Sequence, residues 1–215
     1  MGALITAKEN FHAVSLSGGK DSTCLLLLMI ERGLPIDAVI WADTGMEFPE
    51  MYGHISKVDE HLYRERGLHI TTLRSPKSFE YMMFDEPKQK PSTLENRARL
   101  GVPPYGNGWP GIKVRWCTGQ LKTHQINKEL TRLKGQHRLQ QYVGIAADEA
   151  HRCKDLHYPL VDWGITEAQA LQLCYDRGFD FGGLYRIYTA PPAGAAPFSG
   201  LGSCEIYAII TRSCG

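Results

Sequence analysis

The sequence lacks several features that would identify whole classes of protein. No stretch approaches the roughly 18 consecutive apolar residues of a membrane span. The start of the chain, with Lys8 and Glu9 close behind Met1, lacks the order of parts of a signal peptide. A net charge of +1 over 215 residues offers no general attraction to nucleic acid or to an acidic membrane. We therefore expect a cytoplasmic protein with no membrane partner, whose basic sites are local.

The cysteines and histidines lack the spacings of metal sites. No two cysteines form a Cys-x-x-Cys pair, and in a reducing compartment the set is typical of free thiols. The six are Cys24, Cys117, Cys153, Cys174, Cys204 and Cys214. Cys24 and Cys174 fall within apolar helical patterns, which favours burial. The eight histidines contain no His-x-x-x-His pair. The sequence predicts no zinc or iron–sulfur centre.

Apolar patterns alternate between strands and helices along most of the chain. The elements expected, in order, are strand 11–17, helix 23–33, strand 35–42, helix 49–67, strand 68–73, helix 119–133, strand 138–147 and a threonine-capped helix at 166–179. Strands and helices of these lengths predict right-handed crossovers between parallel strands. The predicted fold class is α/β, as a single doubly wound, parallel-sheet domain.

Residues 85–113 interrupt this alternation with five prolines, four glycines and several cations. A long irregular insert in a domain is either a functional lid or a disordered excursion. The side chains of Lys88, Lys90, Arg97, Arg99 and Tyr105 favour a large acceptor such as nucleic acid. A solvated lid explains them equally well.

The stretch SGGKDS at residues 17–22 joins the first expected strand to the first expected helix. This is the carboxyl edge of the sheet, where open parallel sheets bind ligands. The stretch is not a Walker A loop, because Val14 replaces a required glycine and Asp21 replaces the hydroxyl after Lys20. It offers backbone N–H groups at a helix start, with charge from Lys20 and donors from Ser17 and Ser22. We interpret it as a phosphate-binding loop rather than a plain glycine turn.

Polar residues also follow the second and fourth expected strands. Asp43, Thr44 and Gly45 are placed to reach a ribose or an adenine edge, or to form a strand-ending turn. Asp148 and Glu149 are suited to hold Mg²⁺ through one or two carboxylates, or to cap a helix. Both pairs of alternatives are open at this stage.

Three cations are candidates for the anionic tail of a nucleotide. Arg115, Lys122 and Arg152 follow the insert, and arginine suits bidentate contacts with phosphate or sulfate. Each of them alone is also typical of a solvated surface cation.

Five motifs in order resemble the phosphoadenosine phosphosulfate (PAPS) reductase family of the PP-loop ATP pyrophosphatase superfamily. They are SGGKDS at 17–22, WADTGMEFPE at 41–50, RWCT at 115–118 with Lys122, GIAADEAHR at 144–152 and YPLVDW at 158–163. The resemblance spans residues 11–188. It implies a fold like that of the adenine nucleotide alpha hydrolases, and an adenine nucleotide ligand that is ATP, PAPS or adenylyl sulfate. The family's arginine and serine are replaced here by Ala146 and Ala150, so anion binding there rests on Arg152 and the backbone.

The resemblance also assigns site residues. The catalytic candidates are Lys20, Asp21 and Cys117. The nucleotide-binding candidates are Ser17, Gly18, Gly19, Lys20, Asp21, Ser22, Asp43, Thr44, Gly45, Arg115, Lys122, Gly144, Asp148 and Arg152. No residue is assigned to a resident metal.

The end of the chain departs from the family. We expect a PAPS reductase-like domain at 1–188, with its insert at 85–113, and an aberrant tail at 189–215. The tail lacks the Glu-Cys-Gly-x-His context of the assimilatory reductases. Read one base out of frame, residues 192–198 permit Cys-Trp-Cys-Cys-Pro-Leu, as in phage and bacterial relatives. We therefore hypothesise a frameshift near residue 189, which would remove three cysteines that join Cys117 in a thiolate site.

Two classes of function follow from the resemblance. The first is an enzyme that either cleaves ATP between its α and β phosphates for sulfur transfer or reduces a sulfonucleotide. Its partners would be the nucleotide, a nucleic-acid acceptor and a sulfur donor protein. The second is an inactive nucleotide-binding module that has lost its C-terminal cysteine site.

Overall fold

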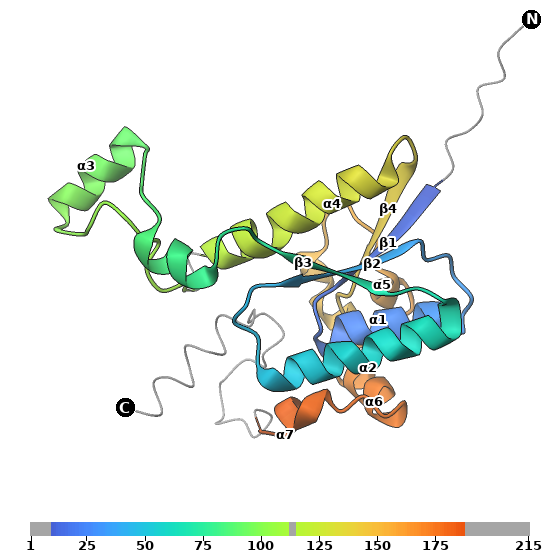
Figure 1. Cartoon of the computed structure of the whole chain (residues 1–215). Coiled ribbons are helices and arrows are strands. Elements are labelled where there is room, and N and C mark those ends of the chain that lie inside the picture. Colours follow the sequence, from blue (N-terminus) through green and yellow to red (C-terminus); the bar gives the residue numbers. More distant parts are fainter. Residues whose placement is uncertain (1–9, 112–114, 188–215) are drawn as a thin grey trace, which may run out of the picture. The chain divides into compact units, whose positions relative to one another are not determined.

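The computed structural model describes residues 10–111 and 115–187 (Figure 1). The described chain divides into two compact units. Unit 1 contains residues 10–42, 49–73 and 126–187, and unit 2 contains residues 43–48, 74–111 and 115–125. The expected tail at 189–215, with Cys204 and Cys214, lies outside the described residues.

A four-stranded sheet forms the framework of unit 1. The strands are β1 (Asn10–Leu16), β2 (Ala38–Asp43), β3 (Ile70–Arg74) and β4 (Arg138–Val143). Their order in the sheet is β3-β2-β1-β4, and β1 pairs in parallel with both β2 and β4. The predicted α/β fold with a parallel sheet is therefore confirmed.

Neighbouring residues of the central strands serve cores on opposite faces of the sheet, because side chains alternate along a strand. Val14 and Val39 belong to a large core with α1 (Lys20–Glu31), α2 (Pro49–Arg66) and α6 (Glu167–Asp176). Ala13 and Ile40 pack with Leu130 of α4 (His124–Lys134). Both faces are covered, as expected of a parallel sheet.

The helices begin and end close to the predicted positions, with informative differences. α1 starts at Lys20 instead of residue 23, so half of the phosphate loop is already helical. Its middle is buried all round, which accounts for the run of leucines. The helix expected at 119–133 opens instead with a π-helical turn, η2 (Thr118–Thr123), before α4. The predicted threonine cap of α6 is confirmed, because Thr166 and Gln169 form a capping box.

Short helical turns lie between and beyond the main elements of unit 1. They are η3 (Ala147–Arg152), α5 (Pro159–Asp162), η4 (Phe181–Gly183) and α7 (Leu184–Ile187). β4 ends at Val143, four residues before the predicted end, and the chain turns at Gly144 toward η3.

Unit 2 corrects the prediction of an irregular insert at 85–113. Residues Pro91–Arg99 form helix α3, with proline in its first turn, and η1 (Tyr81–Asp85) precedes it. The prolines had suggested an irregular chain, but one of them starts the helix. No residue of α3 is buried. The core of unit 2 is a separate cluster: Phe79, Met82, Met83, Trp116, Cys117 and Leu121.

Within the described ranges, the structure contains no helix whose length and apolar character would suit a membrane span.

Candidate functional site

The loop at residues 17–22 is closed by its own serines. The Ser17 and Ser22 hydroxyl oxygens lie 2.8 Å apart, and the Ser22 hydroxyl donates to the Gly19 carbonyl at 3.1 Å. The Ser17 N–H donates to the Ser22 hydroxyl, also at 3.1 Å. Gly19 is the N-cap of α1 and supplies no side-chain cap. The start of α1 therefore offers backbone donors and a positive dipole end, as a phosphate site requires.

Two glycines fix where this loop lies. Gly18 has φ +84°, and a Cβ there would lie 2.5 Å from the Met51 sulfur. A Cβ on Gly144 would lie 2.5–2.6 Å from backbone atoms of Asp21 and Ser22. Gly144, predicted to bind the nucleotide, thus packs directly against the loop backbone. Its absent side chain lets the end of β4 support the start of α1.

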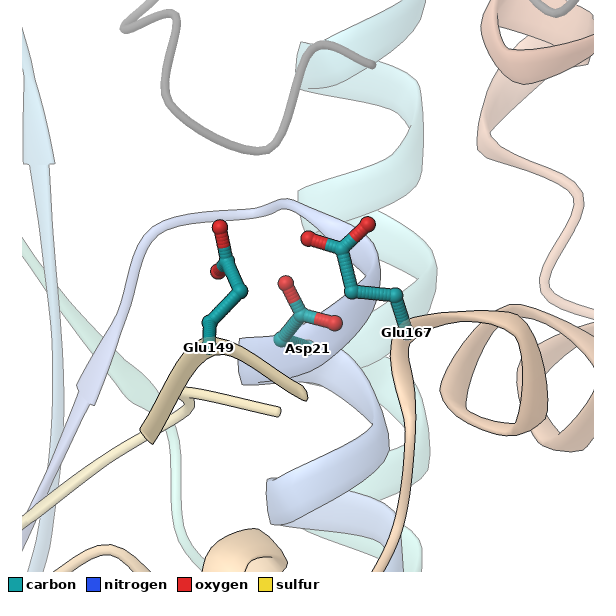
Figure 2. Close-up of side chains that lie close together, drawn as sticks. All are labelled: Asp21, Glu149 and Glu167. Carbon is teal, nitrogen blue, oxygen red and sulfur yellow. The ribbon is translucent and has the colours of Figure 1, made fainter. Parts of the chain in front are cut away.

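The buried ammonium group of Lys20 lies among carboxylates. Its Nζ is 3.2 Å from Asp21 Oδ2 and 3.5 Å from Glu167 Oε2. Glu149 pairs with Arg152. One carboxylate oxygen from each of Asp21, Glu149 and Glu167 lies within 4.8 Å of the other two, and Figure 2 shows the three groups side by side. Three separate elements, α1, η3 and α6, therefore build one acidic cluster beside the phosphate loop.

This acidic cluster, Asp21, Glu149 and Glu167, is incompletely satisfied. Among the described residues, nothing hydrogen-bonds to the buried oxygens Asp21 Oδ1 and Glu167 Oε1. Burial raises the pKa of Asp21 from 3.8 to about 6; Lys20 opposes this rise, whereas Glu167 and Glu149 add to it. Buried carboxylate oxygens without donors are the ligands that Mg²⁺ takes in proteins, so the cluster fits a divalent cation.

Sequence analysis predicted only part of this cluster. Of the two acids suggested for Mg²⁺, Asp148 instead accepts the Glu167 N–H at 3.1 Å and so caps α6. Glu149 does lie in the cluster. Glu167 was missed, because nothing in its local sequence sets it apart from an ordinary acid in the first turn of a helix.

In unit 2, Asp43, Thr44 and Gly45 form the hydrogen-bonded turn that was one of the two alternatives. Asp43 Oδ1 accepts the Gly45 N–H at 2.8 Å, and its Oδ2 pairs with Arg74 at 2.7 Å. Thr44 donates to Glu47 Oε1 at 3.0 Å. The carboxylate of Asp43 therefore already holds the turn together, and a role in nucleotide binding stays a prediction.

The remaining candidates also belong to unit 2. Lys122 Nζ lies 3.1 Å from Glu47 Oε1, so this cation has a buried acidic partner. Arg115 is exposed. Cys117 is 5 % exposed and lies in the apolar cluster with Phe79 and Trp116. That surrounding favours a core residue, whereas a reactive thiol needs solvent access and a positive environment.

Comparison with protein families matches residues 12–169 to the phosphoadenosine phosphosulfate reductase domain. Comparison with curated proteins gives no match. Among solved structures, the U34-tRNA thiolase NcsA from Methanococcus maripaludis, with its 4Fe–4S cluster, is similar at 16 % identity and a TM-score of 0.39. That alignment covers 99 % of this chain and 68 % of the other. The cluster belongs to that protein, and the absence of an iron–sulfur or zinc centre here stays a prediction.

The family match runs from β1 through the phosphate loop and the acidic cluster to the first turn of α6, well over half of the chain. The family predicted from the five motifs is confirmed, and the chain belongs to the phosphoadenosine phosphosulfate reductase domain family.

Proposed function

We propose that this protein binds ATP with Mg²⁺ at the loop 17–22 and cleaves it between the α and β phosphates, leaving an adenylated acceptor ready for sulfur transfer. The observation that carries this proposal is the acidic cluster directly beside the phosphate loop, where two buried oxygens accept no hydrogen bond from any described residue. Reduction of a sulfonucleotide needs a thiol nucleophile and gives no reason for such a cluster. Phosphate chemistry on ATP does, because Mg²⁺ is bound through one or two carboxylates together with phosphates.

The groups at the site have separate roles in the proposed binding. The N–H groups at the start of α1 bind phosphate oxygens, and Gly144 keeps that backbone in place. Asp21, Glu149 and Glu167 would hold Mg²⁺, which when bound neutralises charge on the phosphates. Lys20 lies next to two of these acids, so its ammonium is oriented toward the same region.

Three of the four described cysteines are poorly suited to the reductase branch. Cys24, Cys117 and Cys174 are buried, and Cys153 is half-buried. Attack on sulfate requires an accessible thiolate near an activating charge. None of these three buried thiols meets that requirement in the described structure.

Unit 2 supports a nucleic acid as the acceptor. Tyr81, Phe84, Tyr105 and Trp109 are 39–56 % exposed. A cavity of about 480 Å³ in the same unit is lined by Tyr81 together with Lys77, Lys88 and Lys90. Glu86 pairs with Lys77 and Lys88, which leaves the cavity with a net positive lining. Cations interleaved with exposed aromatic rings are typical of surfaces that bind single-stranded nucleic acid. The sulfur would come from a separate donor protein.

Product analysis separates the branches. The protein is incubated with ATP and Mg²⁺ and, separately, with PAPS and a thiol donor. Pyrophosphate release supports the proposal, and sulfite release would assign the reductase instead. Nucleotide binding with neither product, also in the presence of RNA, would leave an inactive binding module. Glu167→Gln, which removes one carboxylate from the acidic cluster, should release less pyrophosphate. Its matched control is Glu60→Gln, on the exposed face of α2.

A further inference from the structure

Tyr185 of α7 contacts the phosphate loop from the far end of the described chain. Its hydroxyl oxygen accepts a hydrogen bond of 3.0 Å from the backbone N–H of Lys20. Lys20 is the first residue of α1, so this N–H is one of the donors that a helix leaves unpaired at its start. A Cβ on Gly19 would lie 3.3 Å from the same hydroxyl. The phenol therefore lies directly on the loop backbone.

The donor that Tyr185 occupies is of the kind that binds phosphate at helix starts. Burial raises the pKa of Tyr185, so its hydroxyl stays neutral at physiological pH. A hydrogen bond to a charged phosphate oxygen is roughly twice as strong as one between neutral groups. The helix dipole adds a further preference for an anion at this end. A phosphate group is thus the better partner for the Lys20 N–H.

Before Tyr185, the chain has one buried residue followed by two glycines. Phe181 is buried, and its ring lies 4.3 Å from that of His54 in α2. Gly182 and Gly183 follow with φ values of +62° and +80°, a region that glycine enters without a steric penalty. Tyr185 then packs edge-on against Phe181, with ring centroids 4.9 Å apart. Rotation within the glycine pair would move Tyr185 and leave Phe181 in the core.

We propose that Tyr185 is a nucleotide-site residue that fills the phosphate position at the Lys20 N–H in the free protein, and that a phosphate of the nucleotide displaces it. This inference rests on the proposed nucleotide site and adds a competition to it. Binding then includes the release of one protein hydrogen bond and an outward movement of α7.

The competition predicts whether a substitution of Tyr185 strengthens or weakens nucleotide binding. Tyr185→Phe keeps the ring in its packing against Phe181 and removes the competing oxygen. We expect ATP with Mg²⁺, and inorganic pyrophosphate as a second probe, to bind roughly two- to tenfold more tightly, the effect of one net hydrogen bond. Tyr175→Phe, which removes one phenolic hydroxyl from α6, is the control and should leave the affinity unchanged. Isothermal titration calorimetry measures these affinities for the unaltered protein and for both variants.

Hydrogen exchange in the unaltered protein gives a second measurement that needs no variant. On addition of ATP and Mg²⁺, the backbone of residues 184–187 should exchange faster, because α7 leaves the loop, while the start of α1 becomes more protected. If the unaltered protein binds the nucleotide but Tyr185→Phe binds it equally or more weakly, or residues 184–187 become more protected, the competition is wrong. If the unaltered protein binds neither probe, the proposed function itself fails.

Discussion

Replacing Asp21 with asparagine should change how the stability of the protein depends on pH. The carboxyl group of Asp21 has its pKa raised from 3.8 to about 6, mainly by burial. Because the folded pKa is above the unfolded one, this group does not lower the free energy of unfolding well below pH 3.8, where it is protonated in both states. The cost grows as the pH rises toward 6 and is complete above it.

The size of the effect follows from the shift. A difference of about two pKa units corresponds to about 3 kcal/mol, at 1.36 kcal/mol per unit. The side chain is only 13 % exposed, so solvent screening removes little of this. Asp21→Asn keeps the shape of the side chain and removes the charge. The free energy of unfolding of the variant, minus that of the unaltered protein, should therefore rise by about 3 kcal/mol between pH 4 and pH 8.

Urea unfolding in metal-free buffer, followed by fluorescence at several pH values, measures this difference. Glu60→Gln, which removes an exposed carboxylate from α2, should show no comparable pH dependence. Addition of Mg²⁺ above pH 6 should stabilise the unaltered protein and not the variant, since the cation replaces the proton at the cluster. A difference between the two proteins that stays flat from pH 4 to pH 8 would refute the assignment of a buried, destabilised carboxylate.

Three further substitutions and one sequencing experiment test other parts of the account. Gly144→Ala places a Cβ 2.5–2.6 Å from the loop backbone, so thermal melting should show a clear loss of stability and calorimetry a loss of ATP binding; Gly53→Ala, in open space on α2, should not destabilise. Thr166→Ala removes the N-cap of α6 and should cost about 1 kcal/mol in urea unfolding, with weaker Mg²⁺ binding because Glu167 follows it directly; unchanged Mg²⁺ affinity would separate Glu167 from the site. Cys117→Ala should lower stability by about 1 kcal/mol and leave pyrophosphate release intact, and a loss of release by the folded variant would restore Cys117 as a catalytic residue. Sequencing the coding DNA from about codon 189 onward should show a shifted reading frame that encodes the family's usual ending. Third bases that cannot encode this ending would end the frameshift hypothesis.

Much of the fold could be predicted because its signals are local. The leucine run of α1, the spacing of Ile55, Val58 and Leu62 in α2, and the threonine cap of α6 each depend on a few neighbouring residues. The helix α3 was missed because its prolines and its lack of any buried residue obscure the usual apolar pattern. Family motifs located the phosphate loop for the same reason: its glycines, lysine and serines are adjacent.

The acidic cluster and Tyr185 could not be predicted in this way, because they depend on contacts across the fold. Glu167 lies 146 positions from Asp21, and only the packing of α6 beside α1 brings them together. Tyr185 reaches Lys20 over 165 positions. The motif suggested that Gly144 binds the ligand. Only its close approach to the backbone of Ser22, which leaves no room for a Cβ, shows that it supports the loop.

The central claim is that this loop binds ATP through Mg²⁺ held by the acidic cluster. The most direct measurement is calorimetric titration of ATP into the unaltered protein and into Asp21→Asn, each with Mg²⁺ and with a chelator. The account predicts binding by the unaltered protein that requires Mg²⁺ and is lost or strongly weakened in Asp21→Asn. Equal affinity with and without Mg²⁺, or full Mg²⁺-dependent binding by Asp21→Asn, would contradict it.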